Sequence, residues 1–150
     1  MKNGWVAESS TLAQYPILLV EDNPMDVDLT RRAFARHKII NIIEVARDGE
    51  EALSYIQKWE DGEPVPAFIL LDLKLPKVDG LEILRRLKTH PQFCIIPVVV
   101  LTTSSDEHDV YAAYQEGSNS YIVKPVDFDR FIQVVDQIES YWCRLNTLPR

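Results

Sequence analysis

Five short apolar runs, separated by stretches of helical spacing, constrain the fold of this chain more than any other feature. Three of the runs are continuous rather than alternating. One contains the β-branched residues Val98, Val99 and Val100, as expected for a central parallel strand buried on both faces. We predict strands over residues 17–20, 42–46, 67–71, 95–101 and 120–123.

The stretches between these runs carry helix signals. Asp48 can cap one helix, while Ser104 and Glu107 form a capping box for a later helix that Gly117 ends. The regular alternation of strand and helix predicts an α/β chain of the (βα)₅ type, with right-handed crossovers and a doubly wound parallel sheet covered on both faces. The apolar positions that mark these helices are Ala52, Leu53, Ile56, Trp59, Ile83, Leu84, Leu87, Val110, Ala113 and Tyr114.

A chain of 150 residues has room for one ordinary domain and no separate output domain. We expect residues 1–14 to be an N-terminal extension and residues 15–140 to form the domain. Residues 141–150 would then be the end of the last helix and a tail.

Charge and hydropathy exclude several classes of protein. The net charge of −7 and the pI near 4.9 would repel a phosphate backbone, so we expect no direct nucleic-acid binding. No apolar run reaches the roughly 18 to 20 residues that span a bilayer, and no signal peptide is visible, so we expect a cytoplasmic protein without a membrane partner. Cys94 and Cys143 lie far apart without a nearby histidine pair, which indicates ordinary reduced thiols.

Polar side chains stand at the predicted carboxyl ends of four strands. Glu21 and Asp22 follow the first strand, Asp72 the third, Thr102 the fourth and Lys124 the fifth. Ligands of open parallel sheets bind beyond these ends, where the strand order reverses. We expect the five side chains to share one edge of the sheet.

Three converging carboxylates would repel one another by on the order of 4 kcal/mol for a pair 4 Å apart at an effective dielectric constant near 20. Lys124 can offset part of this repulsion, and a divalent cation is the natural partner for the rest. Mg²⁺ fits best, because it keeps several waters and commonly bridges carboxylates to phosphate oxygens. An aspartate carboxylate can also accept a phosphoryl group, which points to phosphoryl transfer.

These residues and the segments around them resemble the receiver domain of two-component response regulators, over residues 16–140. The resemblance implies a flavodoxin-like receiver fold with strand order 2-1-3-4-5. It also implies a stand-alone, single-domain regulator that takes a phosphoryl group from a sensor histidine kinase and catalyses only the transfer to its own aspartate. The matching segments are residues 17–22, 70–76 with Asp79 and Gly80, 96–102 and 117–125.

The resemblance implies a role for each acidic residue of the site. Asp72 would be the phosphoacceptor and a ligand of Mg²⁺. Asp22 would bind the ion directly, Glu21 would bind it directly or through water, and the backbone carbonyl of Lys74 would complete the protein ligands. Lys74 departs from the commonest pattern, in which this position is often Asn or Met, and leaves the lifetime of the phosphoryl group uncertain.

The resemblance also implies the partners of the phosphoryl group. Thr102 would hydrogen-bond one phosphoryl oxygen and Lys124 would pair with another. Tyr121 occupies the position whose ring turns inward when the threonine is drawn toward the phosphoryl group. In receivers the peptide bond between Lys124 and Pro125 is cis.

Finer features are similar to the regulators that partner cyanobacterial phytochromes, which implies a phytochrome as the kinase. They are the segments around Lys74 and Thr102, and Glu139-Ser-Tyr-Trp142. The downstream target is unknown. Because no output domain fits, the signal would leave through a phosphorylation-dependent surface that binds another protein.

Three other functions compete with this interpretation. A flavodoxin-like cofactor-binding protein could use the same edge, but Glu21 and Asp22 stand where a flavin phosphate needs hydroxyls and amides. An aspartyl-phosphate hydrolase generally uses Asp-x-Asp, and here Lys74 is the second residue after Asp72. A phosphorylation-independent interaction module stays open, because the fold does not require transfer.

The last predicted helix carries an apolar stripe that continues beyond the length needed to cover a sheet. The additional residues either fold back on the domain or form an exposed patch, and such patches usually mark an interface. We hypothesise a homodimer built on this helix and the tail. Its candidate interface residues are Tyr141, Trp142 and Leu145, joined by resemblance to paired receivers by Tyr111 and Tyr114.

Overall fold

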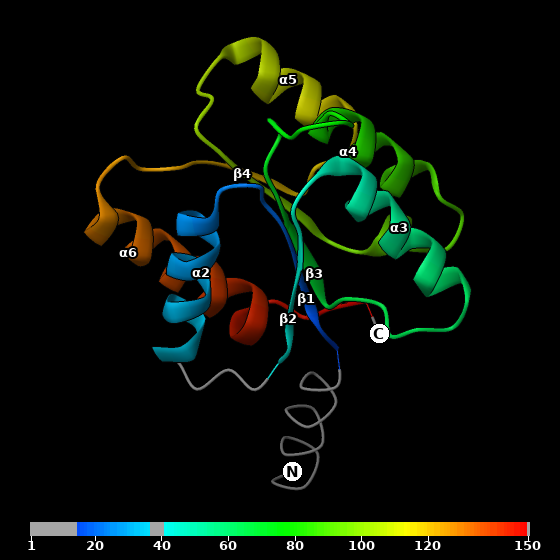
Figure 1. Ribbon diagram of the computed structural model, residues 1–150, viewed down its shortest axis with the longest axis horizontal. Helices are drawn as coiled ribbons and strands as arrows, with labels where there is room; N and C mark the ends of the chain where they lie inside the picture. Colours follow the sequence, from blue (N-terminus) through cyan, green and yellow to red (C-terminus); the bar gives the residue numbers. More distant parts are fainter. Residues whose placement is uncertain (1–14, 37–40, 150) are drawn as a thin grey trace, which may run out of the picture.

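The structure is a computed structural model, which describes residues 15–36 and 41–149. Its core is one parallel sheet of five strands in the order β2-β1-β3-β4-β5 (Figure 1). Both the doubly wound sheet and the predicted strand order are confirmed. The strands are β1 (Ile17–Val20), β2 (Ile43–Ala46), β3 (Phe68–Leu71), β4 (Val98–Thr102) and β5 (Ser120–Val123).

Helices cover both faces of the sheet. Figure 1 shows α2 and α6 on one face and α3, α4 and α5 on the other. No helix in the described part of the chain is both long enough and apolar enough to span a membrane. The helices are α2 (Pro24–Arg36), α3 (Gly49–Glu60), α4 (Gly80–Thr89), α5 (Glu107–Gln115) and α6 (Phe128–Glu139), with a 3₁₀ turn η1 (Phe93–Ile95) and a π-helical turn η2 (Ser140–Leu145).

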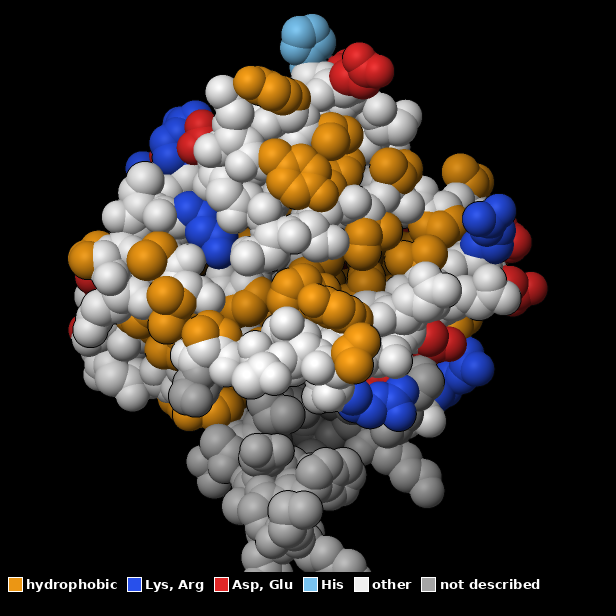
Figure 2. All heavy atoms as spheres, turned by 180° about the vertical axis from the view of Figure 1, so that it is seen from behind, with side chains coloured by type: hydrophobic (Ala, Val, Ile, Leu, Met, Phe, Trp, Pro, Cys, Tyr) orange, Lys and Arg blue, Asp and Glu red, His pale blue; other side chains and the backbone are white. Residues whose placement is uncertain are grey.

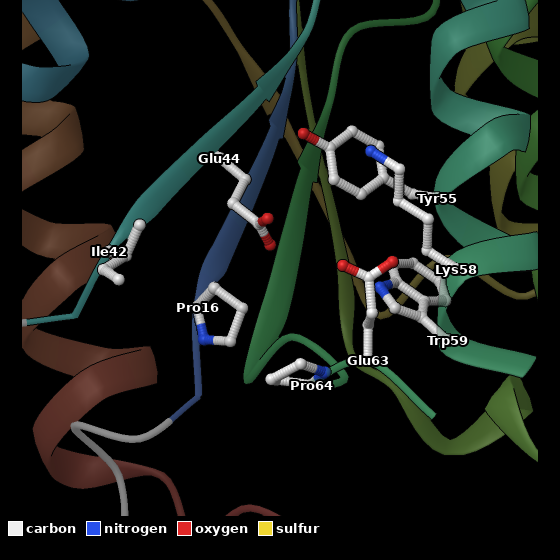
Figure 3. A pocket seen from close by; sticks show the side chains of 8 residues that line it. All are labelled: Pro16, Ile42, Glu44, Tyr55, Lys58, Trp59, Glu63 and Pro64. Atoms are coloured by element: carbon white, nitrogen blue, oxygen red, sulfur yellow. The ribbon is translucent and has the colours of Figure 1, made fainter. Parts of the chain in front are cut away.

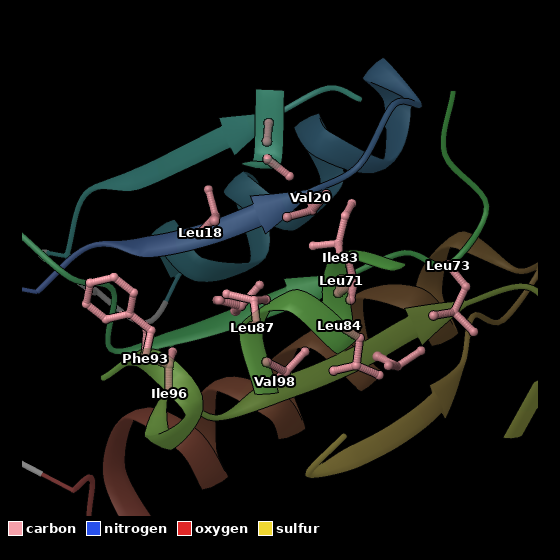
Figure 4. Packing of buried hydrophobic residues seen from close by; sticks show 14 of the residues in the cluster. Leu18, Val20, Leu71, Leu73, Ile83, Leu84, Leu87, Phe93, Ile96 and Val98 are labelled. Carbon is pink, nitrogen blue, oxygen red and sulfur yellow. The ribbon is translucent and has the colours of Figure 1, made fainter. Parts of the chain in front are cut away.

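The three central strands are buried on both faces, as their continuous apolar sequences predict. Side chains alternate between the faces, so Leu18 and Val20 pack under α3 and α4, while Ile17 and Leu19 pack under α2 and α6. Figure 4 shows the first of these clusters, in which α4 buries three residues against β1, β3 and β4. They are Ile83, Leu84 and Leu87.

Two predicted boundaries are confirmed and two are wrong. Asp48 caps α3 by accepting a hydrogen bond from the amide of Glu51. Gly117 ends α5 at a φ of 99°, a left-handed conformation that favours glycine. The run at 95–101 is shorter as a strand, because Ile96 closes the η1 turn by donating to the carbonyl of Phe93, and β4 begins only at Val98.

The second correction concerns the start of α5. Asp106 caps this helix by accepting from the amide of His108, so Ser104 and Glu107 form no capping box. The Ser104 hydroxyl instead donates to the carboxylate of Asp109 at 2.5 Å. The short side chain of Asp106, directly before the helix, reaches the free amides better than a serine two residues earlier.

Of the C-terminal residues, some fold back on the domain and others form an exposed patch, so each of the two predicted outcomes holds for part of the segment. The Trp142 ring stacks on Phe68, with 6.2 Å between ring centroids, and packs with Leu148 against the cluster under α2 and α6. Tyr141 and Leu145 stay 45% and 74% exposed. Trp142 thus folds back on its own domain, and the exposed patch consists of its neighbours. The predicted extension over residues 1–14 lies outside the described residues.

We predict that Trp142→Ala lowers the free energy of unfolding by about 2 kcal/mol, because the change removes a ring packed on the core. Leu145→Ala, from the exposed part of the same turn, should change it by less than about 0.5 kcal/mol. Urea unfolding at low protein concentration measures both. Equal losses in the two variants would contradict the packing of Trp142.

Candidate functional site

Backbone hydrogen bonds continue past the strand ends and hold the polar residues of the sequence pattern at one edge. The amide of Asp72 donates to the carbonyl of Val20 at 3.0 Å, and the amide of Lys124 donates to that of Thr102 at 2.7 Å. The sheet thereby brings the ends of β1, β3, β4 and β5 together. The structure brings the three acids and Lys124 together, and Thr102 ends the neighbouring strand β4.

The Lys124 ammonium is the centre of the site. Its Nζ lies 2.5 Å from Glu21 Oε1, 3.1 Å from Asp72 Oδ2 and 2.9 Å from Asp26 Oδ2. The lysine side chain is only 4% exposed, and those of Glu21 and Asp72 are 4% and 10% exposed. The contacts to Glu21 and Asp72 are therefore buried charge-assisted contacts rather than surface ion pairs, and the contact to Asp26 is partly buried.

Asp26 is a member of the site that the sequence interpretation missed. It lies in the first turn of α2, where a carboxylate is stabilised by the free amides of the helix. An acid one turn into the helix that follows Glu21 and Asp22 was the available signal, because this turn begins at the same edge of the sheet.

Three carboxylates can hold a divalent cation. One oxygen each of Glu21, Asp22 and Asp72 lie within 4.8 Å of one another. Asp22 is exposed and the other two are buried, which gives the cluster one open side. Carboxylate oxygens at this spacing are the ligands that hard divalent ions prefer.

The charges of the site are unbalanced without such an ion. Burial raises the pKa of Glu21 to about 7, against the hydrogen bond from Lys124, and repulsion by Asp72 adds to the rise. Burial acts to lower the pKa of Lys124, but hydrogen bonds to Glu21 and Asp26 together with the charge of Asp72 leave it above its ordinary value. The lysine therefore stays charged, and an excess of negative charge remains.

Thr102 has a free hydroxyl at this edge. The residue is fully buried at 0% exposure, and its Oγ1 has no hydrogen-bond partner in the described structure. A buried hydroxyl without a partner costs about 1–3 kcal/mol. Such a group is available to donate to an oxygen bound at the site.

Tyr121 lies on β5 and connects the site to the loop after β4. The ring is half-buried against the cluster under α3 and α4, and its hydroxyl donates to the carbonyl of Ser104 at 2.8 Å. The residue thus links the loop that follows Thr102 to the strand that precedes Lys124.

The loop after β3 is held closely against Asp72. The amide of Lys74 donates to Asp72 Oδ1 at 3.2 Å, while the lysine as a residue is exposed. A Cβ at Gly80 would lie 2.6 Å from the carbonyl oxygen of Asp72 and 2.5 Å from Leu73 Cα, so only glycine fits there. The Lys124–Pro125 bond is trans, as are all peptide bonds of the described residues, and the cis bond implied by the resemblance is wrong here.

A pocket of about 140 Å³ lies away from the converging acids and Lys124. Figure 3 shows it between β2, α3 and the loop after α3, with Pro16, at the amino end of β1, among its lining residues. Its walls include Tyr55, over whose ring Lys58 Nζ lies at 4.5 Å. This pocket contains none of the converging residues. The candidate chemistry is at the opposite, carboxyl edge of the sheet.

Comparisons with known proteins agree with this geometry. Residues 17–136 match the model of the response regulator receiver domain. The chain is 42% identical to the response regulator Rcp1 of Synechocystis sp. over 89% of this chain and 92% of that protein. It is 45% identical to the probable methanogenesis regulatory protein FilR2 of Methanothrix harundinacea, over 89% and 86%.

Solved structures give the same picture. The crystal structure of the phosphorylated cyanobacterial phytochrome response regulator RcpA superposes with a TM-score of 0.87 at 39% identity, over 92% of this chain and all of that one. The Mn²⁺-bound form of Rcp1 superposes with a TM-score of 0.86 at 40% identity, over 91% and 99%.

We predict that Glu21→Gln stabilises the metal-free chain at neutral pH. The pKa of Glu21 is 4.5 in the unfolded chain and about 7 in the folded one, so the folded state holds more protons between these values. The contribution of Glu21 to stability is present below pH 4.5 and is lost as pH rises through 7. Gln removes this loss, which is about 3 kcal/mol at pH 7.5 for this shift in pKa.

Urea unfolding in a chelating buffer at pH 5 and pH 7.5 measures the effect. The gain of the variant over the parent should grow between the two pH values. Glu107→Gln, which removes an exposed carboxylate from α5, is the control and should show no such growth. A pH-independent difference for Glu21→Gln would refute the buried-charge explanation.

Proposed function

Because the chain belongs to the response regulator receiver domain family, whose function is to accept a phosphoryl group, we propose that Asp72 is the acceptor and that a sensor histidine kinase is the donor. The observation that carries this assignment is the contact of the Lys124 ammonium with Asp72, 3.1 Å apart at an edge where a buried hydroxyl has no partner. The ammonium and the Thr102 hydroxyl are available for two oxygens of an incoming phosphoryl group.

In the proposed reaction, a carboxylate oxygen of Asp72 attacks the phosphorus of a phosphohistidine. The new P–O bond forms as the P–N bond breaks, and the imidazole leaves with the electron pair and takes a proton from solvent. Lys124 and Thr102 stabilise charge on the phosphoryl oxygens, which is the main task of a protein in phosphoryl transfer. The chain thereby catalyses its own modification without turning over a substrate.

Mg²⁺ is the proposed ion of the acidic cluster, held by Glu21, Asp22, Asp72 and the backbone carbonyl of Lys74. When bound, it neutralises part of the negative charge of the carboxylates and the phosphoryl oxygens. The three carboxylates within 4.8 Å of one another support a divalent ion. The Mn²⁺ form of Rcp1 supports the same class of ion. Mg²⁺ is preferred because it keeps waters that can give way to phosphate oxygens.

Tyr121 and Thr102 are the proposed switch. Donation from Thr102 to a phosphoryl oxygen would draw the end of β4 and its loop toward Asp72. The hydroxyl of Tyr121 donates a hydrogen bond to the carbonyl of Ser104 in that loop. The Tyr121 ring would change position because this acceptor moves. The change would then reach the exposed surface of α5 and β5.

The proposed kinase is a phytochrome, and the proposed location is the cytoplasm. Similarity to Rcp1 and to the phytochrome regulator RcpA supports the first part. The probable methanogenesis regulatory protein FilR2 is similar to the same degree. Phosphoryl-transfer assays against candidate kinases would identify the donor. The flavodoxin-like alternative is not favoured, because the family match covers the whole edge at which a cofactor would bind.

A homodimer is also proposed, on the exposed residues around the final helix. Tyr111 and Tyr114 on α5 are 67% and 52% exposed, and Tyr141 and Leu145 are exposed as well. Trp142 neighbours Tyr141 in the chain, and its ring packs on Phe68. Large aromatic side chains are favoured anchors at interfaces.

We predict that Asp72→Asn abolishes phosphoryl uptake and leaves the domain folded. Incubation with acetyl phosphate and Mg²⁺, followed by intact-mass analysis, should add one phosphoryl group to the parent and none to the variant. Asp127→Asn, which keeps a good cap on α6, is the control and should take up the group normally. Uptake at parental stoichiometry by Asp72→Asn would sink the assignment.

Lys74 places an exposed cation two residues after the proposed acceptor. We predict that Lys74→Ala changes the rate of dephosphorylation by more than about threefold, or roughly 0.65 kcal/mol in the barrier, because the side chain can shield the acyl phosphate or hinder water. The decay of the phosphorylated mass after removal of the donor measures this. Equal rates would show that the side chain points away.

The homodimer predicts that Leu145→Asp weakens association at least tenfold, because two like charges would be placed in an apolar contact. Sedimentation over a range of concentrations, with and without acetyl phosphate, measures the dimer. Asp61→Leu, at the C-terminus of α3, is an opposite exchange outside this surface and should leave the dissociation constant unchanged. A parent chain that is monomeric at high micromolar concentration would refute the proposal.

A further inference from the structure

All three N–H groups of the Lys124 ammonium already have carboxylate acceptors. An ammonium donates three hydrogen bonds, and the contacts to Glu21, Asp26 and Asp72 use all three. While Asp72 is still a carboxylate, an incoming phosphoryl oxygen can pair with this ammonium only by replacing one of the three acceptors. The acceptor that is easiest to replace therefore affects how readily the phosphoryl group is taken up.

The three contacts differ in what their loss would cost. The side chains of Glu21 and Asp72 are 4% and 10% exposed, so a carboxylate released there would stay buried without a counter-ion. The Asp26 side chain is 21% exposed, so water can solvate its carboxylate after release. The contact to Asp26 is therefore the one that can be broken at the lowest cost.

The Asp26 carboxylate is not the cap of its own helix. The side chain of Asn23 fills that role at the start of α2, where it accepts hydrogen bonds from the amides of Met25 and Asp26 at 2.9 and 3.4 Å. The Asp26 carboxylate instead accepts from Lys124 at 2.9 Å, across a separation of 98 positions in the sequence. This contact therefore acts on the site at the edge of the sheet rather than on the start of the helix.

The charge of Asp26 is better placed to act on Asp72 than that of a surface carboxylate. Water and salt screen charges on the open surface. Figure 2 shows many charged side chains of this kind, which lie mostly toward the rim of the face while hydrophobic side chains cross its middle. Asp26 instead contacts an ammonium whose side chain is only 4% exposed and which also lies 3.1 Å from Asp72 Oδ2. Asp26 therefore acts on an incoming phosphoryl group at short range.

We propose that Asp26 is a positioning residue that competes with the phosphoryl group for Lys124 and thereby slows phosphoryl uptake. The inference rests on the proposed acceptor role of Asp72 and adds a residue that sets the rate. The Asp26 carboxylate occupies one N–H group of the ammonium, and its negative charge also opposes an anionic donor. Loss of this charge leaves Lys124 in place, because its buried contacts to Glu21 and Asp72 remain.

Initial rates of phosphoryl uptake by the full-length chain test this competition. The donor is acetyl phosphate, from which acetate leaves with the electron pair of the broken P–O bond, and intact mass measures the uptake at saturating Mg²⁺. Asp26→Asn keeps an oxygen beside the ammonium but removes the charge, so uptake at low donor concentration should be at least about threefold faster than in the parent. Threefold corresponds to about 0.65 kcal/mol, on the order of the repulsion between two unit charges about 6 Å apart in bulk water.

Asp28→Asn is the matched control. Asp28 lies on the same helix two residues after Asp26, but its side chain is 59% exposed and pairs with Arg32 at 3.0 Å. The control variant loses the same charge from the open surface, so its rate of uptake should equal that of the parent within error. An equal acceleration in both variants would show that net charge, and not the contact with Lys124, sets the rate, and would overturn the inference.

Ionic strength separates this electrostatic role from a structural one. Salt screens the approach of an anionic donor, so the ratio of the Asp26→Asn rate to the parental rate should fall toward one as the salt concentration rises. A variant that is faster only because its fold has changed would keep the same ratio. A ratio above one that does not depend on salt would therefore overturn the inference.

A rate for folded Asp26→Asn that is equal to or below the parental rate would also overturn the inference, and would leave Asp72 as the acceptor. Circular dichroism checks the fold. Asp26→Ala, which also removes the charge and should also exceed the parental rate, decides the matter if Asp26→Asn does not fold. A parent chain that takes up no phosphoryl group would overturn the acceptor role of Asp72 together with the inference, so the two failures are distinguishable.

Discussion

One buried ammonium holds the functional edge of this protein together. Lys124 contacts Glu21, Asp26 and Asp72, and these carboxylates would otherwise repel one another by several kcal/mol. Burial makes each of these charges costly, so the arrangement is stable only while the lysine is paired. The lysine neutralises one charge of several, and the site is left with a need for further positive charge. The excess negative charge that destabilises the fold also attracts a divalent ion.

The scaffold gives this contact its geometry. Apolar strands buried on both faces fix the register of the sheet, and the register carries Asp72 and Lys124 to one edge through backbone bonds to Val20 and Thr102. The loop after β3 cannot relax away, because Gly80 packs directly on the carbonyl of Asp72. Rigidity on this side contrasts with the loop after β4, which is tied to β5 through one hydroxyl of Tyr121. The proposed switch residues, Thr102 and Tyr121, lie on the β4 and β5 side.

Sequence patterns were sufficient for the parts of the protein that depend on local chemistry. Continuous apolar runs identified the central strands, and the acids, threonine and lysine after them identified the edge. The strand order came from family resemblance, since periodicity does not specify which strands are neighbours. Asp26 was missed because a helix of unknown direction does not reveal which of its side chains turns back to the sheet. Trp142 was ambiguous for a similar reason: an apolar residue past the last helix has no defined partner until Phe68 is placed beneath it.

The position of Lys124 joins the chemistry to β5, the last strand of the sheet. A phosphoryl group on Asp72 would replace the single negative charge of its carboxylate with roughly 1.5 to 2 negative charges at neutral pH, next to an ammonium that also contacts Glu21 and Asp26. The phosphoryl oxygens and the carboxylates would compete for the same few hydrogen-bond donors, so the contacts to Glu21 and Asp26 would weaken as the new ones form. Lys124 directly follows Val123, the last residue of β5. The residue that would contact the phosphoryl group is therefore the direct neighbour in the chain of the last strand of the sheet.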